Sequence, residues 1–151
     1  MVTSPLEPID RAILRELVTD GRKTLTDLAE RVGLSVSAVH QRVRRLEQRG
    51  AVRGYAARLD LEQLNLPLTA LISLTPIDPA APDDYPNRLQ HLSRIEACYS
   101  VAGDESYVLL VRVASPVALE ELLRQVRESA NVSTRTTVVL STPFEGRPPA
   151  I

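Results

Sequence analysis

The sequence lacks tryptophan, has a single cysteine, and is poor in aromatic residues, which make up 3% of its 151 residues. Leucine, valine, isoleucine and alanine must therefore build its core. Cys98 has no partner for an internal disulfide, and its apolar surroundings predict a packed thiol. No apolar run approaches the roughly 20 residues that span a bilayer, and the first residues lack the pattern of a signal peptide. We therefore expect a cytoplasmic protein without a membrane partner.

The patterns of catalytic and metal sites are also missing from the sequence. His40 and His91 lie far apart, and no spacing of cysteine, histidine and carboxylate residues suggests a metal site. There is no glycine-rich phosphate loop, and no nucleophile motif frames any serine. The sequence therefore predicts a protein that is not an enzyme and that holds no cofactor.

Charge is divided unevenly between the two parts of the chain, although the formal net charge is -1. Residues 1–60 contain eleven basic and eight acidic residues, whereas residues 61–151 contain seven basic and eleven acidic residues. A positive N-terminal part on an acidic body indicates a localised anionic partner.

Three short helices are predicted in the first part of the chain. Apolar residues at helical spacing predict the first helix over residues 9–17, and Asp10 suits its N-terminal cap. The second helix is predicted over about 26–32. The third begins after Ser35, which can cap it, and reaches about residue 49. Its apolar stripe is formed by Val36, Val39, Val43 and Leu46.

The junction of the second and third helices carries the strongest functional signal. Ala29 is small enough for two helices to cross closely, and Gly33 permits a tight turn. Opposite the apolar stripe, outward polar side chains suit the DNA major groove, where arginine pairs with guanine and glutamine with adenine. The predicted DNA-binding residues are Ser35, Ser37, His40, Gln41, Arg42, Arg44, Arg45, Arg49 and Arg53. Among them, Arg42, Arg49 and Arg53 suit phosphates, which position a protein without specifying sequence. The predicted partner is double-stranded DNA.

The rest of the chain alternates between strands and helices. Residues 51–58 are predicted to form a short β-ribbon, or wing. Strands are then predicted over 68–75, 95–101, 107–113 and 132–142, with helices over 84–94 and from Pro116 onward. This β-α-β-β-α-β order is the ferredoxin-like pattern.

The fold class is therefore predicted as α+β, with two domains. An N-terminal winged helix-turn-helix domain occupies residues 1–60, a linker occupies residues 61–67, and a ferredoxin-like βαββαβ domain occupies residues 68–151. Within the second domain, residues 144–151 are expected to fray.

Both faces of the predicted sheet are apolar, most clearly in the strand at 107–113. Two helices can cover only one face, and the other would form a larger apolar patch than monomers usually expose. We therefore expect at least a homodimer. The alternative is that the wing or the linker covers the second face.

In their order and spacing these motifs resemble the Lrp/AsnC (leucine-responsive/asparagine, or feast/famine) family of transcription regulators. The matching stretches are Ile9-Asp10-Arg11, Asp20-Gly21-Arg22, Leu28-Ala29, Val32-Gly33-Leu34-Ser35, Arg42-Val43, Arg45-Leu46-Glu47, Gly54-Tyr55 and Thr134-Arg135-Thr136. The resemblance implies that the first domain binds DNA and that the second dimerises through its sheet. It also implies tetramers or octamers built from dimers. An amino acid or similar metabolite is expected between these domains, where it changes assembly or DNA affinity and so controls amino-acid metabolism.

The family also suggests where the effector binds. Its turn between the second and third strands of the second domain has the pattern G-x-x-D-Y, whereas residues 103–107 here are Gly-Asp-Glu-Ser-Tyr. Since Ser106 replaces the aspartate, Asp104 or Glu105 is the alternative carboxylate for a ligand ammonium group. The predicted effector-binding residues are Tyr99, Ser100, Gly103, Asp104, Glu105, Ser106, Thr136 and Val138. The alternative is an ordinary hairpin turn.

Two other functions stay open at this point. An architectural protein would wrap DNA through phosphates with little sequence preference, whereas Gln41 and Arg44 favour base recognition. Haem-precursor decarboxylases are similar to this family in architecture. A tetrapyrrole pocket favours histidine and aromatic side chains, which are scarce in this sequence.

Overall fold

A computed structural model describes residues 5–78 and 80–151 of the chain. The chain forms two compact units, of which the first comprises Met1–Arg58 and Phe144–Ile151, and the second Leu59–Pro143. The first boundary lies close to the expected end at residue 60. In contrast, the segment that we expected to fray at the end of the second domain packs within the first unit.

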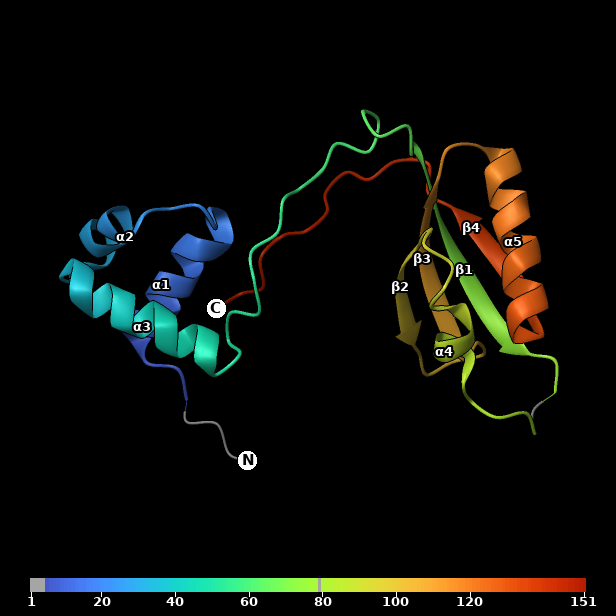
Figure 1. Cartoon of the computed structure of the whole chain (residues 1–151), viewed down its shortest axis with the longest axis horizontal. Helices are drawn as coiled ribbons and strands as arrows, with labels where there is room; N and C mark the ends of the chain where they lie inside the picture. Colours follow the sequence, from blue (N-terminus) through green and yellow to red (C-terminus); the bar gives the residue numbers. More distant parts are fainter. Residues whose placement is uncertain (1–4, 79) are drawn as a thin grey trace. The chain divides into compact units, whose positions relative to one another are not determined.

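The first unit contains α1 (Pro8–Thr19), α2 (Leu25–Val32) and α3 (Val36–Gln48) (Figure 1). Its buried core is formed by Ile13, Leu14, Leu17, Leu28, Ala29, Val39, Val43 and Leu46. The expected cap of α1 is wrong: Glu7 is the N-cap residue and makes no side-chain cap bond. Asp10 is buried, and its carboxylate binds Arg42 instead.

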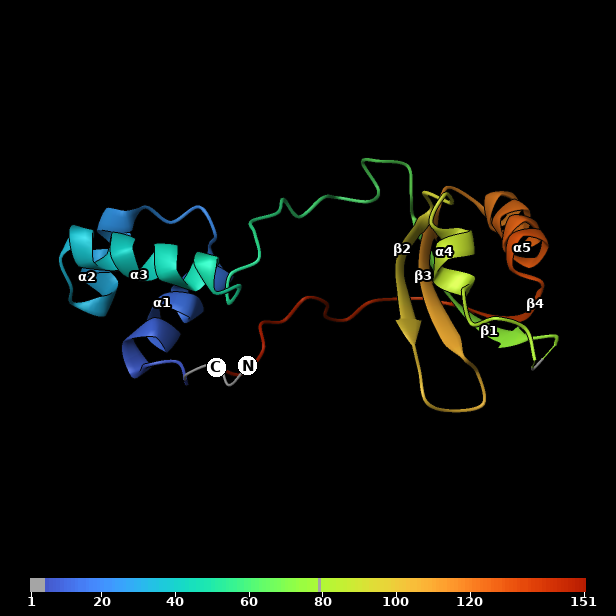
Figure 2. The ribbon, with the colours of Figure 1, turned by 60° about the horizontal axis from the view of Figure 1, so that its bottom comes forward.

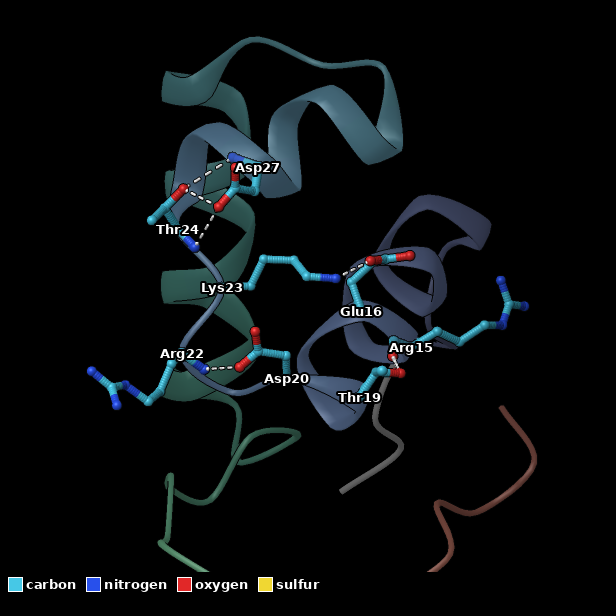
Figure 3. A network of polar contacts seen from close by, with 8 residues as sticks. All are labelled: Arg15, Glu16, Thr19, Asp20, Arg22, Lys23, Thr24 and Asp27. Carbon is cyan, nitrogen blue, oxygen red and sulfur yellow. Dashed lines mark hydrogen bonds and ion pairs between the residues drawn. The ribbon is translucent and has the colours of Figure 1, made fainter.

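Local capping explains where α2 begins and ends and where α3 begins. The Thr24 side chain accepts a hydrogen bond from the Asp27 amide, and the Asp27 carboxylate accepts one from the Thr24 amide (Figure 3). This capping box satisfies amides that the first helical turn leaves unpaired. Gly33 ends α2 in the left-handed region with φ 69°, a conformation that favours glycine. The Ser35 hydroxyl then accepts a hydrogen bond from the Ala38 amide and caps α3.

The expected β-ribbon at residues 51–58 is not formed, because this segment has no strand pairing in the structure. The amides of Ala51 and Val52 instead donate to the Leu46 carbonyl at 2.9 and 3.1 Å. Val52 packs against the helical core. The chain after α3 is therefore held by the end of the helix, and the remaining residues to 58 are extended without a partner strand.

The second unit is a four-stranded antiparallel sheet with two helices (Figure 1, Figure 2). In chain order its elements are β1 (Leu68–Pro76), α4 (Tyr85–Leu89), β2 (Ile95–Ser100), β3 (Tyr107–Val113), α5 (Pro116–Ala130) and β4 (Val132–Val138). The strand order is β2-β3-β1-β4, which confirms the ferredoxin-like prediction. Helix α4 is shorter than expected because the chain turns after Leu89, whose carbonyl accepts from the Leu92 amide. Strand β4 ends at Val138, four residues before its expected end at 142.

Helices α4 and α5 cover the same face of the sheet. Their buried side chains join those of β1 and β3 in one core, which includes Ile72, Leu109, Val111, Leu122 and Val126. Alternate residues of the strands point to the other face. Leu71 is 37% exposed there. We call this the helix-free face and define it by Leu71, Ala97, Tyr99, Val108 and Leu110.

Cys98 lies on β2, at an edge of the sheet, and is exposed. The expected packed thiol is therefore wrong, since an edge strand has no neighbour on one side to cover it. In the described part of the chain, none of the helices combines the length and the apolar character needed to cross a membrane.

Candidate functional site

One surface of α3 carries most of the polar residues that the sequence assigned to DNA. Ser37, Gln41 and Arg44 are exposed and recur at a spacing of three to four residues, so that they share one stripe of the helix. Gln48 continues the stripe, and His40 and Arg45 flank it; all three are exposed. The surface thus offers hydroxyl, amide and guanidinium groups together.

The opposite side of α3 fixes this surface to the other helices. Val39, Val43 and Leu46 are 0%, 7% and 1% exposed and belong to the helical core. Val36, which we expected in the same apolar stripe, is 44% exposed because it stands in the first turn, beyond the edge of the core. The apolar part of the anchor of α3 is therefore built by three residues.

The start of α3 is arranged for contact with an anion. Ser35 is exposed, and its Oγ lies 3.2 Å from that of Ser37. The amides of the first helical turn have no partner within the helix, and a helix N-terminus favours negative charge. Arg49 and Arg53, two of the predicted phosphate ligands, are exposed after this point, as is Arg45.

Arg42 lies on α3 but binds the protein itself. Its Nη1 donates to Oδ1 of Asp10 at 2.8 Å and to Oε2 of Glu7 at 2.9 Å. These hydrogen bonds, first that to Asp10 and then that to Glu7, raise the pKa of the Arg42 guanidinium. The Asp10 side chain is only 13% exposed. The guanidinium of Arg42 therefore joins α3 to α1, and its assignment to a phosphate stays a prediction.

We expect Arg42→Ala to lower the free energy of unfolding of the first unit by about 1–2 kcal/mol. The change leaves the Asp10 carboxylate in a largely buried place without its cation, while solvent screening limits the loss. Urea unfolding followed by circular dichroism measures the effect. Arg45→Ala is the matched control, because Arg45 is exposed on the same helix and its loss should change stability by no more than about 0.5 kcal/mol. Equal stabilities of the two variants would contradict this role of Arg42.

Tyr55 fixes the chain that leaves α3, a role that the local sequence did not reveal. Its hydroxyl donates to Oε1 of Glu47 at 3.1 Å. Its ring lies so close to Gly21 that a Cβ there would be 3.1 Å from the Tyr55 Cδ1 atom. Burial, and then the hydrogen bond to Glu47, raise the pKa of the Tyr55 hydroxyl. The Gly54-Tyr55 motif thus ties the end of α3 to the end of α1.

An ion pair between Lys23 and Glu16 braces the turn between α1 and α2 (Figure 3). The hydrogen bond from Lys23 lowers the pKa of the Glu16 carboxyl. The Asp20 carboxylate accepts a hydrogen bond from the Arg22 amide in the same turn. These bonds fix the turn that joins α1 to α2, and so the helices that support α3.

The predicted effector residues do not form one group within a single chain. Tyr99 on β2 pairs with Val108, whereas Thr136 on β4 pairs with Ile72. Since paired residues point to the same face, Tyr99 lies on the helix-free face and Thr136 on the helix-covered face. Two strands separate β2 from β4, so their backbones lie about 14 Å apart at a spacing of about 4.8 Å. One small ligand cannot touch both residues in one copy.

The turn between β2 and β3 contains the central part of the predicted effector site. Glu105 forms an ion pair with Arg135 of β4, so its carboxylate already has a cation. Gly103 and Asp104 are exposed. A Cβ on Gly103 would meet nothing within 4 Å, so nothing in a single chain requires glycine there. The Ser106 amide donates to the Leu74 carbonyl at 3.0 Å and fixes the turn to β1.

The described ranges 5–78 and 80–151 contain no group of three or more histidine, cysteine, aspartate or glutamate residues placed to hold a metal ion. His40 and His91 are both exposed. His40 lies on α3, in the first unit, and His91 follows α4 in the second.

Comparison with known proteins identifies both units. Residues 6–53 match the family described as winged helix-turn-helix DNA-binding, and residues 69–149 match the Lrp/AsnC ligand binding domain. The HTH-type transcriptional regulator LrpA of Mycobacterium tuberculosis is 58% identical over 142 residues, which cover 94% of this chain and 95% of that protein.

Solved structures agree over both units. The feast or famine regulatory protein of M. tuberculosis, in complex with L-methionine, has a TM-score of 0.93 at 56% identity and covers 96% of this chain and 99% of its own. A transcriptional regulator of Neisseria meningitidis, also in complex with L-methionine, has a TM-score of 0.86 at 29% identity and covers 93% and 94%. The protein described here belongs to the Lrp/AsnC family of transcriptional regulators, with a helix-turn-helix DNA-binding domain and an amino-acid-binding domain.

Proposed function

We propose that α3 enters the major groove of double-stranded DNA and that Ser37, Gln41 and Arg44 contact base edges. The observation that carries this proposal is that these side chains are exposed on one stripe while the opposite side of α3 is buried. Arginine and glutamine each have two groups that can bond to one base, which gives sequence preference. We assign Arg45, Arg49 and Arg53 to phosphates, with Ser35 and the start of α3 beside them.

We further propose that two copies of the chain pack through the helix-free face. Tyr99 is 54% exposed there, and Leu71 lies at the centre of the sheet beside Leu110, its partner on β3. Apolar side chains in the middle of a sheet gain stability when a second surface removes them from water. Tetramers or octamers of such dimers are the expected larger assemblies, as the family resemblance implies.

We propose that a second copy of the chain supplies the effector residues that lie too far from the others within one chain. We assign the ammonium group of the amino acid to Asp104, because Glu105 is paired with Arg135 and Asp104 is exposed. Gly103 leaves space for a close approach of ligand or partner. We propose that Tyr99, Ser100 and Ser106 complete the site near this turn, and that Thr136 and Val138 contribute from another copy. The L-methionine in two related structures supports an amino acid as the effector.

A thermal-shift screen of the twenty amino acids tests the effector site. An amino acid that binds the native state raises its melting temperature. We expect Asp104→Asn to weaken binding of the responding amino acid about 10- to 100-fold, since it removes a charge-assisted hydrogen bond of about 1.5–3 kcal/mol. Glu120→Gln is the matched control, because Glu120 is exposed on α5. Equal shifts in both variants would contradict the assignment of Asp104.

We propose a sequence-specific regulator of amino-acid metabolism, acting on DNA in the cytoplasm, in preference to an enzyme or an architectural protein. The family assignment and the exposed α3 stripe support this choice. Footprinting beside an excess of random DNA tests it. A defined footprint supports the regulator, whereas uniform protection of all sequences supports an architectural role.

A further inference from the structure

The segment Phe144–Ile151 returns from the sheet domain and packs on α1 of the DNA-binding domain. The Nε of Arg15 donates a hydrogen bond of 2.7 Å to the backbone oxygen of Ile151. The Ile151 side chain packs against the buried core of the three helices. In Figure 3 the Arg15 side chain extends from α1 on the side opposite Lys23. The α1 surface around Arg15 thus receives a segment distant from it in sequence.

Two further observations describe the middle of this segment. A Cβ on Gly146 would lie 3.7 Å from Nη2 of Arg58, at the end of the extended chain that follows α3. The Arg147 guanidinium lies over the Phe144 ring, 3.8 Å from its centroid, a distance typical of a cation–π contact. The segment therefore meets the DNA-binding domain at two places, near Arg58 and near Arg15.

The composition of the segment suits it for this contact. The rings of Pro148 and Pro149 each fix the backbone angle φ, so that the segment has less conformational entropy to lose when it packs. Gly146 adopts φ 62°, which permits a bend that other residues rarely make. Phe144 itself is 64% exposed, so the apolar contact with the helical core depends on Ile151.

A short stretch of chain joins the sheet to the segment that packs on α1. Strand β4 ends at Val138, and only residues 139–143 separate it from the segment on α1. Residues 59–67 form the other covalent connection of the sheet to the helices. The sheet is thus joined to the segment on α1 by five residues, in addition to the connection that follows α3.

We propose that residues 144–151 form a strap that binds the α1 surface around Arg15 and transmits changes at the β4 edge to the DNA-binding helices. The transmission rests on the proposed function, because it requires an effector that acts on the sheet domain. The docking of the strap on α1 does not require an effector and is tested separately.

Hydrogen exchange of the full-length protein tests the docking. We expect Ile151→Asp to increase the exchange rate of the α1 amides about fivefold, because a charge in the apolar contact releases the strap and loosens the helix. Ala150→Asp is the matched control, since it places the same charge one residue earlier, at an exposed position. Exchange in β3 should be the same in both variants. Equal α1 exchange in the two variants would overturn the proposal.

The transmission is tested by DNA affinity with and without L-methionine, using the melting temperature as a separate measure of L-methionine binding. We expect L-methionine to raise the melting temperature of all three proteins and to change the DNA affinity of the unmodified protein and of Ala150→Asp. Ile151→Asp should lose at least half of that change in affinity. A full response in Ile151→Asp would overturn the coupling role. If L-methionine did not alter the unmodified protein, L-methionine would be excluded as its effector, while the α1 exchange rates would still decide whether the strap is docked.

Discussion

Replacing Leu71 with aspartate is expected to convert the protein into monomers and to weaken its binding to a two-site DNA about 100-fold or more. In a dimer each DNA-binding domain increases the effective concentration of the other at the neighbouring site, and this avidity is worth about 10²–10⁴ in affinity. Leu71 is 37% exposed in the central strand β1. A carboxylate there is tolerated by a single chain but not in an apolar interface, where it has no cation.

Sedimentation measures the mass of the variant, and fluorescence anisotropy measures its affinity for one-site and two-site DNA. Val117→Asp is the matched control, because Val117 is 74% exposed on α5, away from the helix-free face. Leu110→Asp provides an independent test at the residue that pairs with Leu71. Circular dichroism confirms that each variant folds. A folded Leu71→Asp variant with the mass of the unmodified protein would contradict the proposed interface.

The helices and strands that follow from local patterns were predicted well. Ser35 and Gly33 mark the junction of α2 and α3 because capping and positive φ depend on residues only a few positions apart. Strand β3 has the predicted bounds 107–113, since an apolar run between two turns defines its ends. The apolar character of both faces of the sheet also predicted a face that the two helices leave uncovered.

Contacts between distant residues escaped prediction. Arg42 and Asp10 are 32 positions apart, and no local pattern shows that one neutralises the other. From sequence alone, an arginine on a helix beside other arginines is therefore predicted to bind phosphate. The contact of Ile151 with Arg15 spans 136 positions. A segment rich in proline was expected to fray because nothing near it in sequence indicates its partner.

For the effector site, the sequence could not predict which residues lie close together. The sequence predicted Gly103 and Asp104 in one turn, where both are exposed, but sequence order could not show that Tyr99 and Thr136 lie on opposite edges and faces of the sheet. Strand order and register determine this, and both arise from pairings between distant strands. The proposed site, shared between copies, depends in addition on an interface that no single chain contains.

Arg44→Ala and Arg53→Ala are expected to weaken DNA binding in different ways. Arg44 lies on the exposed α3 stripe, so its loss should reduce the preference at one base position by about 1–3 kcal/mol, or roughly 5- to 150-fold. Arg53 follows α3 and is exposed. Its loss should weaken binding to all sequences alike. The affinity should also depend less steeply on salt concentration, by the amount expected for the loss of about one phosphate contact.

Because the two substitutions remove the same charge, the comparison separates base recognition from electrostatic attraction. A DNA site selected from a random pool by the unmodified protein serves as the reference, and affinities are measured for that site, its single-base variants and random DNA over a range of salt concentrations. If Arg44→Ala kept the base preference of the unmodified protein and only lowered the salt dependence, Arg44 would be a phosphate ligand. The bases would then be recognised by Gln41 and Ser37, whose side chains share the α3 stripe. Gln41→Ala would show this as a loss of preference for adenine, the base that glutamine pairs with through two hydrogen bonds.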